Sequence, residues 1–215
     1  MKNTSLHVYV ITENVPSLHR THLDVAAAAV AGGADIIQFR DKTMPDDEFR
    51  VTAQKLLQLC RAQGGPLIVN DRVEIAVQIG ADGIHVGHED MSVLELQRRI
   101  PPGMILGVSA RNYNEAVALA DCGADYLGVG PIFATPSKSD AGEPIGLDEL
   151  CRICETVKLP IVAIGGITLS NLPDVTDTGA AGAAVISAVT HQPDMTLATS
   201  EFRAIWEQPL RAKAK

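Results

Sequence analysis

The chain has no apolar run long enough to cross a bilayer, which takes about 20 residues. Its N-terminal apolar run, Leu6–Ile11, is short and is followed at once by Thr12-Glu13-Asn14, so it lacks the pattern of a secretory signal. Aromatic residues make up only 4% of 215 residues, so the core must be built from Ala, Val, Ile and Leu. These absences predict a cytoplasmic protein with no membrane partner.

Basic runs are also missing, and the net charge is −8. Proteins that bind nucleic acids or membrane surfaces usually carry a positive stripe, so we expect neither kind of partner. Any phosphate that the protein binds must therefore be held by a few local cations, by a metal ion or by backbone amides.

Cysteine is rare and its pattern is incomplete. Cys151 and Cys154 have the spacing of a metal site, but no second pair or nearby His completes four ligands. We expect these two residues, with Cys60 and Cys122, to be ordinary thiols of a reducing compartment.

What the chain does contain is a repeated tripeptide. Gly-Ala-Asp occurs at 33–35, 80–82 and 123–125, and a weaker copy, Gly-Ala-Ala, stands at 179–181. Each copy ends a helical pattern and precedes an apolar run, which is typical of a helix C-cap, a tight turn and a buried strand.

The segments between the copies complete an alternation of strands and helices. The expected strands are 7–11, 36–39, 67–69, 83–86, 105–108, 126–129, 161–164 and 182–186. The expected helices are 17–31, 45–63, 73–79, 92–100, 113–121, 147–157, 169–178 and 197–206.

Eight strand–helix pairs in this length predict an α/β fold, a (β/α)8 TIM barrel forming one domain over residues 1–215. We expect residues 208–215 to form a frayed tail. An open doubly wound sheet is the alternative, but its glycine-rich turn after the first strand is absent.

A barrel sorts the polar residues into two ends. Residues that precede a strand lie at the bottom and serve stability, whereas residues that follow a strand lie at the top, where barrel enzymes keep their sites. Asp35, Asp82 and Asp125 precede strands, so we expect them to be turn residues.

Two acidic residues follow neighbouring strands at the top. Asp71 follows the strand at 67–69, and Asp90 follows the strand at 83–86. Two carboxylates on one rim can hold Mg²⁺, which completes its shell with water and substrate phosphates. The alternatives are that Asn70 or Asp71 caps the helix near Val73 and that Asp90 is a turn residue.

Cations and glycines at the same end suggest two phosphate-binding regions. Arg40 and Lys42 follow the second strand, and Lys138 lies in a long loop after the sixth. Gly165-Gly166 and Ser187 follow the last two strands, where barrels often bind phosphate. A diphosphate and a monophosphate could therefore be joined here.

In these segments the chain strongly resembles the thiamine phosphate synthase family. The matching segments are 38–42, 69–71, 83–90, 107–109, 130–138 and 164–167. The resemblance implies a Mg²⁺-dependent transferase of thiamine biosynthesis, with one Mg²⁺ per subunit. It joins hydroxymethylpyrimidine diphosphate to a thiazole monophosphate, and diphosphate leaves by a dissociative mechanism.

The resemblance also implies roles for individual residues. Asp71 and Asp90 would bind Mg²⁺. The catalytic residues would be Arg40, Lys42, Ser109 and Lys138. The pyrimidine diphosphate is bound by Gln38, Phe39, Arg40, Asp41, Lys42, Asn70, Ser109 and Lys138, and the thiazole phosphate by Thr135, Ser137, Gly165, Gly166, Ile186 and Ser187.

The chain departs from the family pattern at His88, where Gln is usual, and at Ala134, where Pro is common. Neither change removes a charge that the mechanism needs. We expect His85 and Cys122 to be core residues without a catalytic role. The sequence leaves the oligomeric state open, with a homodimer as a candidate.

Two other functions remain to be weighed. A thiazole tautomerase is a related barrel that binds the same thiazole phosphate, but it lacks the paired carboxylates and the loop lysine. A non-catalytic phosphate-binding barrel would not need Arg40, Asp71, Asp90 and Lys138 together.

Overall fold

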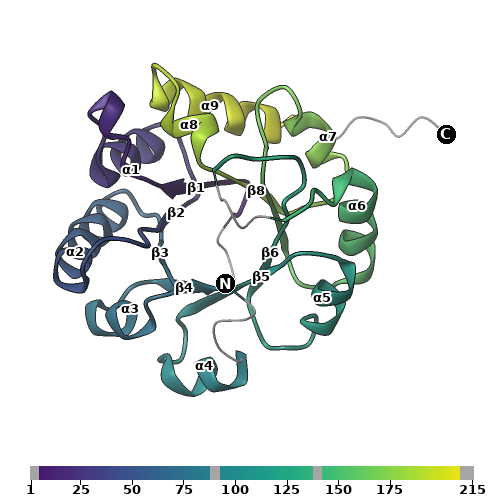
Figure 1. Cartoon of the computed structure of the whole chain (residues 1–215), viewed down its shortest axis with the longest axis horizontal. Coiled ribbons are helices and arrows are strands. Elements are labelled where there is room, and N and C mark those ends of the chain that lie inside the picture. Colours follow the sequence, from purple (N-terminus) through teal and green to yellow (C-terminus); the bar gives the residue numbers. More distant parts are fainter. Residues whose placement is uncertain (1–4, 88–92, 138–141, 209–215) are drawn as a thin grey trace.

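A computed structural model describes residues 5–87, 93–137 and 142–208. Eight parallel strands form a closed ring in chain order, β1 to β8, and β8 pairs with β1. The closed ring excludes the open sheet and confirms the (β/α)8 barrel (Figure 1). The strands are β1 Val8–Thr12, β2 Ile36–Phe39, β3 Leu67–Asn70, β4 Gly83–Val86, β5 Ile105–Ala110, β6 Tyr126–Val129, β7 Ile161–Ile164 and β8 Gly182–Val185.

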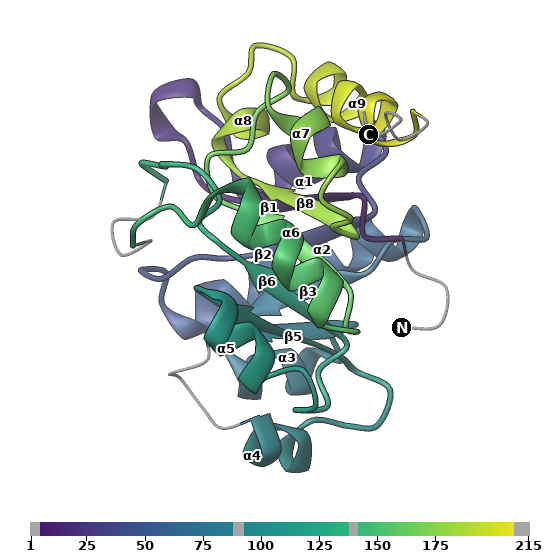
Figure 2. The ribbon, with the colours of Figure 1, turned by 90° about the vertical axis from the view of Figure 1, so that its right-hand side faces the viewer.

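Helices surround the ring, and in the side view of Figure 2 α5 and α6 lie over its outer face. They are α1 His22–Ala31, α2 Asp46–Ala62, α3 Val73–Ile79, α4 Val93–Arg99, α5 Tyr113–Ala118, α6 Gly146–Thr156, α7 Leu172–Thr176, α8 Ser187–Thr190 and α9 Met195–Trp206, with a 3-10 helix, η1, at Pro16–Leu18. Within the described part of the chain, no helix is long and apolar enough to span a membrane.

The first helix begins five residues later than the sequence pattern predicts. His19 has a left-handed backbone (φ 52°), which ends η1, and a bridge between Val15 and Arg20 closes the turn. Thr21 and Asp24 then form a capping box that starts α1. Hydrophobic periodicity cannot detect this break, because the break is set by local hydrogen bonds.

Two further helices differ from expectation. The helix predicted over 169–178 is only α7, because Asn171 accepts a hydrogen bond from the Thr168 amide in a turn before it. The short α8 is not predicted at all. It begins at Ser187, directly after β8.

Alternation along the strands divides the core into two parts. Side chains that point inward fill the barrel, including Tyr9, Ile68 and Tyr126. Side chains that point outward, such as Val10 and Phe39, pack against the helices. The inner cluster reaches the carboxyl ends of β1 and β7 at Ile11 and Ile164.

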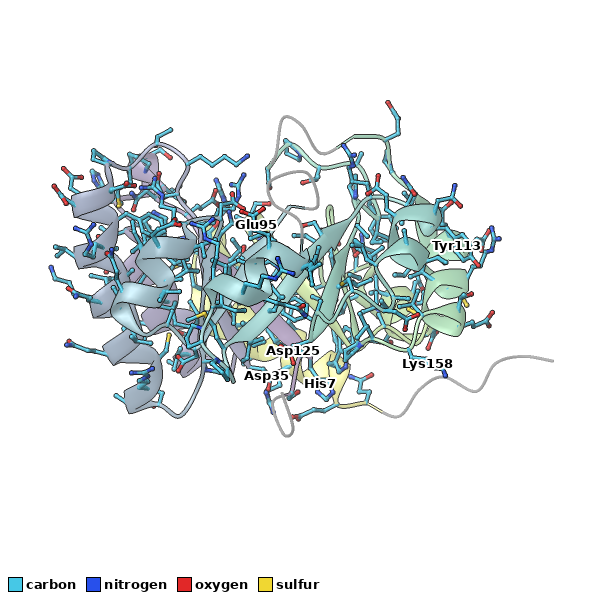
Figure 3. All side chains as sticks on the ribbon, turned by 90° about the horizontal axis from the view of Figure 1, so that it is seen from below. His7, Asp35, Glu95, Tyr113, Asp125 and Lys158 are labelled. Atoms are coloured by element: carbon cyan, nitrogen blue, oxygen red, sulfur yellow. The ribbon has the colours of Figure 1, made fainter. Side chains whose placement is uncertain are left out.

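The Gly-Ala-Asp copies have a common role at the amino ends of the strands. The carboxylate of Asp35 accepts a hydrogen bond from Val8 N (2.9 Å), that of Asp82 from Leu67 N (3.0 Å), and that of Asp125 from Leu106 N (2.9 Å). Figure 3 shows Asp35 and Asp125 at the same end of the barrel. Each even-numbered strand thus holds the strand before it.

Arginine side chains reinforce two of these carboxylates. Arg203 from α9 lies 3.0 Å from Asp35, and Arg61 from α2 lies 3.0 Å from Asp82. The fourth copy has Ala181 where the others have Asp, and it retains only the backbone bond from its N–H to the Ile161 carbonyl (2.7 Å). The prediction that these aspartates are turn residues is therefore correct but incomplete.

The four cysteines are free thiols. Burial raises the pKa of Cys60 to about 12 and that of Cys154 to about 11. Protonated thiols of this kind are poor nucleophiles and poor metal ligands.

Candidate active site

A cavity of about 430 Å³ opens at the carboxyl ends of the strands. Its walls come from residues at the ends of the strands and in the loops that follow them. Ten of the predicted site residues line it: Gln38, Arg40, Asn70, Ser109, Thr135, Ser137, Gly165, Gly166, Ile186 and Ser187. The two phosphate-binding regions expected from the sequence thus share one cavity.

The remaining predicted residues lie elsewhere. Phe39, Asp41, Lys42 and Asp71 are described but are not among the residues that line the cavity. Asp90 and Lys138, like His88, lie outside the described residues.

Asp71 has an uncommon backbone conformation at the end of β3. Its φ is +61°, and its N–H donates to the carbonyl of His85 on β4 (2.9 Å). Non-glycine residues rarely adopt this region, and such outliers concentrate at functional sites.

The cap alternative for this segment is wrong. The N-cap of α3 is Arg72, and it makes no side-chain capping bond. The N-cap position is thus not held by Asp71, and the chemistry of the Asp71 carboxylate fits Mg²⁺. Among the described residues no group of three or more His, Cys, Asp or Glu is placed to hold a metal ion, so this fit rests on one carboxylate, with Asp90 outside the described residues.

Asp41 supports the loop after β2 from below. One carboxylate oxygen accepts hydrogen bonds from Thr43 N (2.9 Å) and Met44 N (2.8 Å), and the other lies 3.1 Å from His22 Nε2. Burial alone would raise the pKa of Asp41, but these hydrogen bonds outweigh it, so the pKa is lowered. The prediction that the Asp41 side chain faces the substrate therefore finds no support in its contacts.

His22 of α1 packs against Phe39 of β2. His22 is buried, and its Nδ1 lies 2.8 Å from the Thr12 hydroxyl. The loss of hydration lowers its pKa despite the neighbouring Asp41 carboxylate. The Phe39 ring is fully buried between His22 and Phe49, so it faces the helices, as alternation with Gln38 and Arg40 requires.

Arg72 links the loop after β3 to the loop after β2. Its Nη2 donates to the carbonyls of Asp41 (3.1 Å) and Met44. The guanidinium also pairs with Asp46 and lies 4.3 Å from the Phe49 ring centroid. Because Arg72 follows Asp71 directly, its hydrogen bonds connect the loop that carries Asp71 to the loop that carries Arg40.

Inside the barrel, five polar side chains form a continuous chain of hydrogen bonds below the cavity. Gln38 Nε2 donates to the Tyr9 hydroxyl (2.8 Å), which lies 2.8 Å from the Tyr126 hydroxyl. His85 lies between Tyr126 (Nδ1, 3.0 Å) and Ser109 (Nε2, 2.9 Å). All five residues line the cavity.

The prediction that His85 is a core residue is thus wrong, and the two tyrosines were not recognised as site residues. Cys122, in contrast, packs half-buried at the edge of the outer core, as expected. The alternation of side chains along β4 places His85 on its inner face. This alternation does not predict whether an inner residue is buried in the core or lines a cavity.

Two glycines within strands are the sequence signal that could have indicated this row of hydrogen-bonded side chains. A Cβ at Gly107 would lie 2.3 Å from the Tyr126 hydroxyl and 2.5 Å from His85 Nδ1, and one at Gly128 would lie 3.0 Å from His85 Cε1. A glycine inside a strand often marks the close approach of another group. Here that group is the pair formed by His85 and Tyr126.

The opposite wall of the cavity brings three loops together. Ser137 Oγ lies 3.2 Å from Ser187 Oγ at the start of α8. Gly165 and Gly166 both have positive φ, and a Cβ on either would collide with the loop at 131–134. The glycine pair thus permits the close approach of the loop after β6.

Comparison with known proteins gives a consistent result. The sequence profile described as thiamine monophosphate synthase matches residues 8–189. The chain belongs to this family. It is 49% identical over 198 residues to the thiamine-phosphate synthase of Chloroflexus aurantiacus, covering 92% of this chain and 91% of the relative. It is 46% identical over 208 residues to that of Roseiflexus sp. strain RS-1, covering 97% and 88%.

A solved structure agrees. The thiamine phosphate pyrophosphorylase of Pyrococcus furiosus superimposes with a TM-score of 0.87 at 40% identity, covering 95% of this chain and 96% of that one. The chain is thus a transferase of the thiamine monophosphate synthase family. The family match spans every strand of the barrel and all but one of the residues that line the cavity, the exception being Gln192.

Proposed function

We propose that this protein is a Mg²⁺-dependent thiamine phosphate synthase. It joins 4-amino-2-methyl-5-hydroxymethylpyrimidine diphosphate to 4-methyl-5-hydroxyethylthiazole phosphate and releases diphosphate. The observation that carries this proposal is that, in a member of the thiamine monophosphate synthase family, residues of both predicted phosphate-binding regions line one cavity. Its walls join Gln38, Arg40, Asn70 and Ser109 on one side to Ser137, Gly165, Gly166 and Ser187 on the other.

The pyrimidine diphosphate would lie on the first wall. Arg40 can hold two phosphate oxygens with its planar fork, and Asn70 can donate a further hydrogen bond. Lys42, on the same loop, and Lys138 would add positive charge. Asp71 and Asp90 would hold one Mg²⁺, which would supply charge neutralisation to the leaving diphosphate.

The thiazole phosphate would lie on the second wall. Thr135, Ser137 and Ser187 offer hydroxyls, Gly165 and Gly166 offer closely placed backbone, and Ile186 offers an apolar surface. This division keeps the two anionic groups apart while their reacting ends meet in one cavity.

The bond changes require no protein nucleophile. The bond between the pyrimidine methylene carbon and the diphosphate oxygen breaks, and its electron pair leaves with the diphosphate. The thiazole nitrogen then donates its lone pair to the methylene carbon and forms the new carbon–nitrogen bond. The task of Arg40, Asn70 and Ser109 is to position the substrates and to stabilise charge as it develops.

The proposal extends to the surroundings of the reaction. We propose small phosphorylated molecules as partners, with no nucleic acid or membrane, in the cytoplasm, and a homodimer as the candidate assembly. A thiazole tautomerase or a non-catalytic phosphate-binding barrel remains the second possibility. Both would use the wall of Ser137 and Ser187 without needing the wall of Arg40.

The direct test is an assay of the purified protein with both substrates and Mg²⁺. We expect thiamine phosphate and diphosphate in equal amounts, and neither product after chelation of the metal. Formation of a thiazole tautomer alone would support the second possibility. The absence of any product in the presence of Mg²⁺ would overturn the proposal.

A further inference from the structure

A row of hydrogen-bonded side chains lines the cavity and connects Gln38 with Ser109 on its first wall. Its members come from five strands: Gln38 from β2, Tyr9 from β1, Tyr126 from β6, His85 from β4 and Ser109 from β5. Tyr9 and Tyr126 are each only 1% exposed. Burial raises the pKa of both phenols above the usual value, so the chain transmits hydrogen-bond direction rather than charge.

The number of protons limits how this chain can be ordered. Each phenol has one proton to donate, and neutral histidine has one N–H. If Gln38 donates to Tyr9, then Tyr9 donates to Tyr126 and Tyr126 donates to His85 Nδ1. His85 must then carry its proton on Nε2 and donate it to Ser109.

With neutral His85, the reverse order is the only other one that keeps all four hydrogen bonds. It requires the Gln38 amide to turn over, so that Ser109 donates to His85, and Tyr9 donates to the Gln38 carbonyl. Any mixed order leaves a buried phenol proton without an acceptor, which costs about 1–3 kcal/mol.

The two ends of the chain are therefore coupled. In the first order the free amide atom of Gln38 is an acceptor, and the Ser109 hydroxyl proton is a donor. In the reverse order Gln38 is the donor and Ser109 the acceptor. The Gln38 carbonyl and the Ser109 proton are thus both free in the first order, which is the order that the placed amide gives, and both engaged in the reverse order.

We propose that Tyr9, Tyr126 and His85 form a relay that holds Gln38 and Ser109 in opposite hydrogen-bonding roles. The relay thereby selects a heterocycle that presents one donor and one acceptor in a fixed arrangement. An aminopyrimidine has this property, because its amino group donates and its ring nitrogen accepts. The inference rests on the proposed function, since that function places a pyrimidine between Gln38 and Ser109.

The relay makes Tyr9 a positioning residue whose effect reaches Ser109 only through Tyr126 and His85. The test compares kcat/KM for the aminopyrimidine diphosphate with that for its analogue in which an oxo group replaces the amino group. We expect Tyr9→Phe and Tyr126→Phe to lower the preference for the amino substrate by about tenfold, which corresponds to about 1.4 kcal/mol. Tyr113→Phe is the matched control, since its hydroxyl lies on the outer surface, 3.4 Å from Thr156 Oγ1.

A double-variant cycle separates a relay from a loss of packing. If Tyr9 acts through Ser109, then adding Tyr9→Phe to Ser109→Ala should not lower the preference any further. An equal loss with both substrates, or fully additive effects of the two changes, would overturn the relay.

A spectroscopic measurement tests the relay without turnover. With ¹⁵N-labelled histidine, Tyr126→Phe should shift the His85 Nδ1 resonance, Tyr9→Phe should shift it less, and Tyr113→Phe should leave it in place. An unmoved resonance in Tyr126→Phe would disprove the relay. If the variants show these shifts but the wild-type protein makes no thiamine phosphate, the relay stands and the proposed function is disproved.

Discussion

The two ends of the barrel place the same residue type in different settings. At the amino ends, Asp35, Asp82 and Asp125 direct their carboxylates to the backbone of the neighbouring strand. At the carboxyl end, Asp71 adopts a left-handed backbone with a φ of +61°, and it is not the N-cap of α3. From this comparison we expect the end of the strand at which an aspartate stands to predict its role better than its sequence neighbours do.

The largest effect should follow from a change at the carboxyl end. Asp71→Asn keeps a residue that tolerates left-handed backbone but removes the negative charge that would hold Mg²⁺. We expect kcat/KM to fall by about three orders of magnitude, since metal stabilisation of the leaving group is worth several kcal/mol. The melting temperature should change little.

Asp47→Asn is the matched control, because Asp47 is an exposed residue of α2 paired only at the surface with Arg50. It should leave the rate unchanged. A normal rate for Asp71→Asn would mean that the Asp71 carboxylate does not hold Mg²⁺ in the reaction.

A change at the amino end should show the opposite profile. Asp125→Ala leaves the Leu106 N–H without its acceptor, so we expect the free energy of unfolding to fall by about 1–3 kcal/mol. Chemical denaturation would measure this loss, and kcat should be retained well below the melting temperature. Asp121 is an exposed neighbour, so Asp121→Ala should leave the free energy of unfolding nearly unchanged. A loss of kcat in Asp125→Ala would contradict a purely structural role for Asp125.

A pH experiment tests the support beneath the substrate loop. Burial lowers the pKa of His22, so the unfolded chain binds a proton that the folded chain does not. Stability contributed by neutral His22 is therefore present above about pH 6.5 and is lost as the pH falls toward the lowered folded value.

The wild type should accordingly lose stability between pH 7 and the folded pKa of His22 more steeply than His22→Gln. Melting curves at several pH values would measure the two slopes. His19→Asn, which changes an exposed histidine, should keep the wild-type slope, and identical slopes for all three proteins would show that His22 does not titrate in this way.

The smallest effect concerns the incomplete fourth repeat. Ala181 already donates to the Ile161 carbonyl, as Asp35 does to Val8 and Asp125 to Leu106. Ala181→Asp should add the missing carboxylate and raise the melting temperature by a few degrees, since 1 kcal/mol is worth about 2–4 °C in a chain of this size. The neutral Ala181→Asn should gain less, and a lower melting temperature would mean that packing at this site excludes a carboxylate.

Much of the fold could be predicted because its signals are local and repeated. The Gly-Ala-Asp copies mark the turn before three strands, and short apolar runs mark the strands themselves. The start of α1 and the whole of α8 could not be predicted in this way. The capping box of Thr21 and Asp24 competes with a continuous apolar pattern, and a four-residue helix is too short to show a period.

The site divides in the same manner. Residues directly after a strand, such as Arg40, Ser109 and Ser187, were predicted because the barrel places them at the top. The inner residues Tyr9, Tyr126 and His85 were missed, because their importance depends on which strands face each other across the barrel. The contacts of Asp41 could not be predicted, because its partner, His22, lies on another element.

The carboxylate bonds at the amino ends have a consequence for how the chain folds. They join residues 27, 15 and 19 positions apart, whereas the pairing of β1 with β8 joins the two ends of the barrel sequence. Short loops cost less entropy to close than long ones. We expect refolding to protect the Val8, Leu67 and Leu106 amides before the β1–β8 pairing closes the ring, and pulsed hydrogen exchange that found the reverse order would contradict this sequence of events.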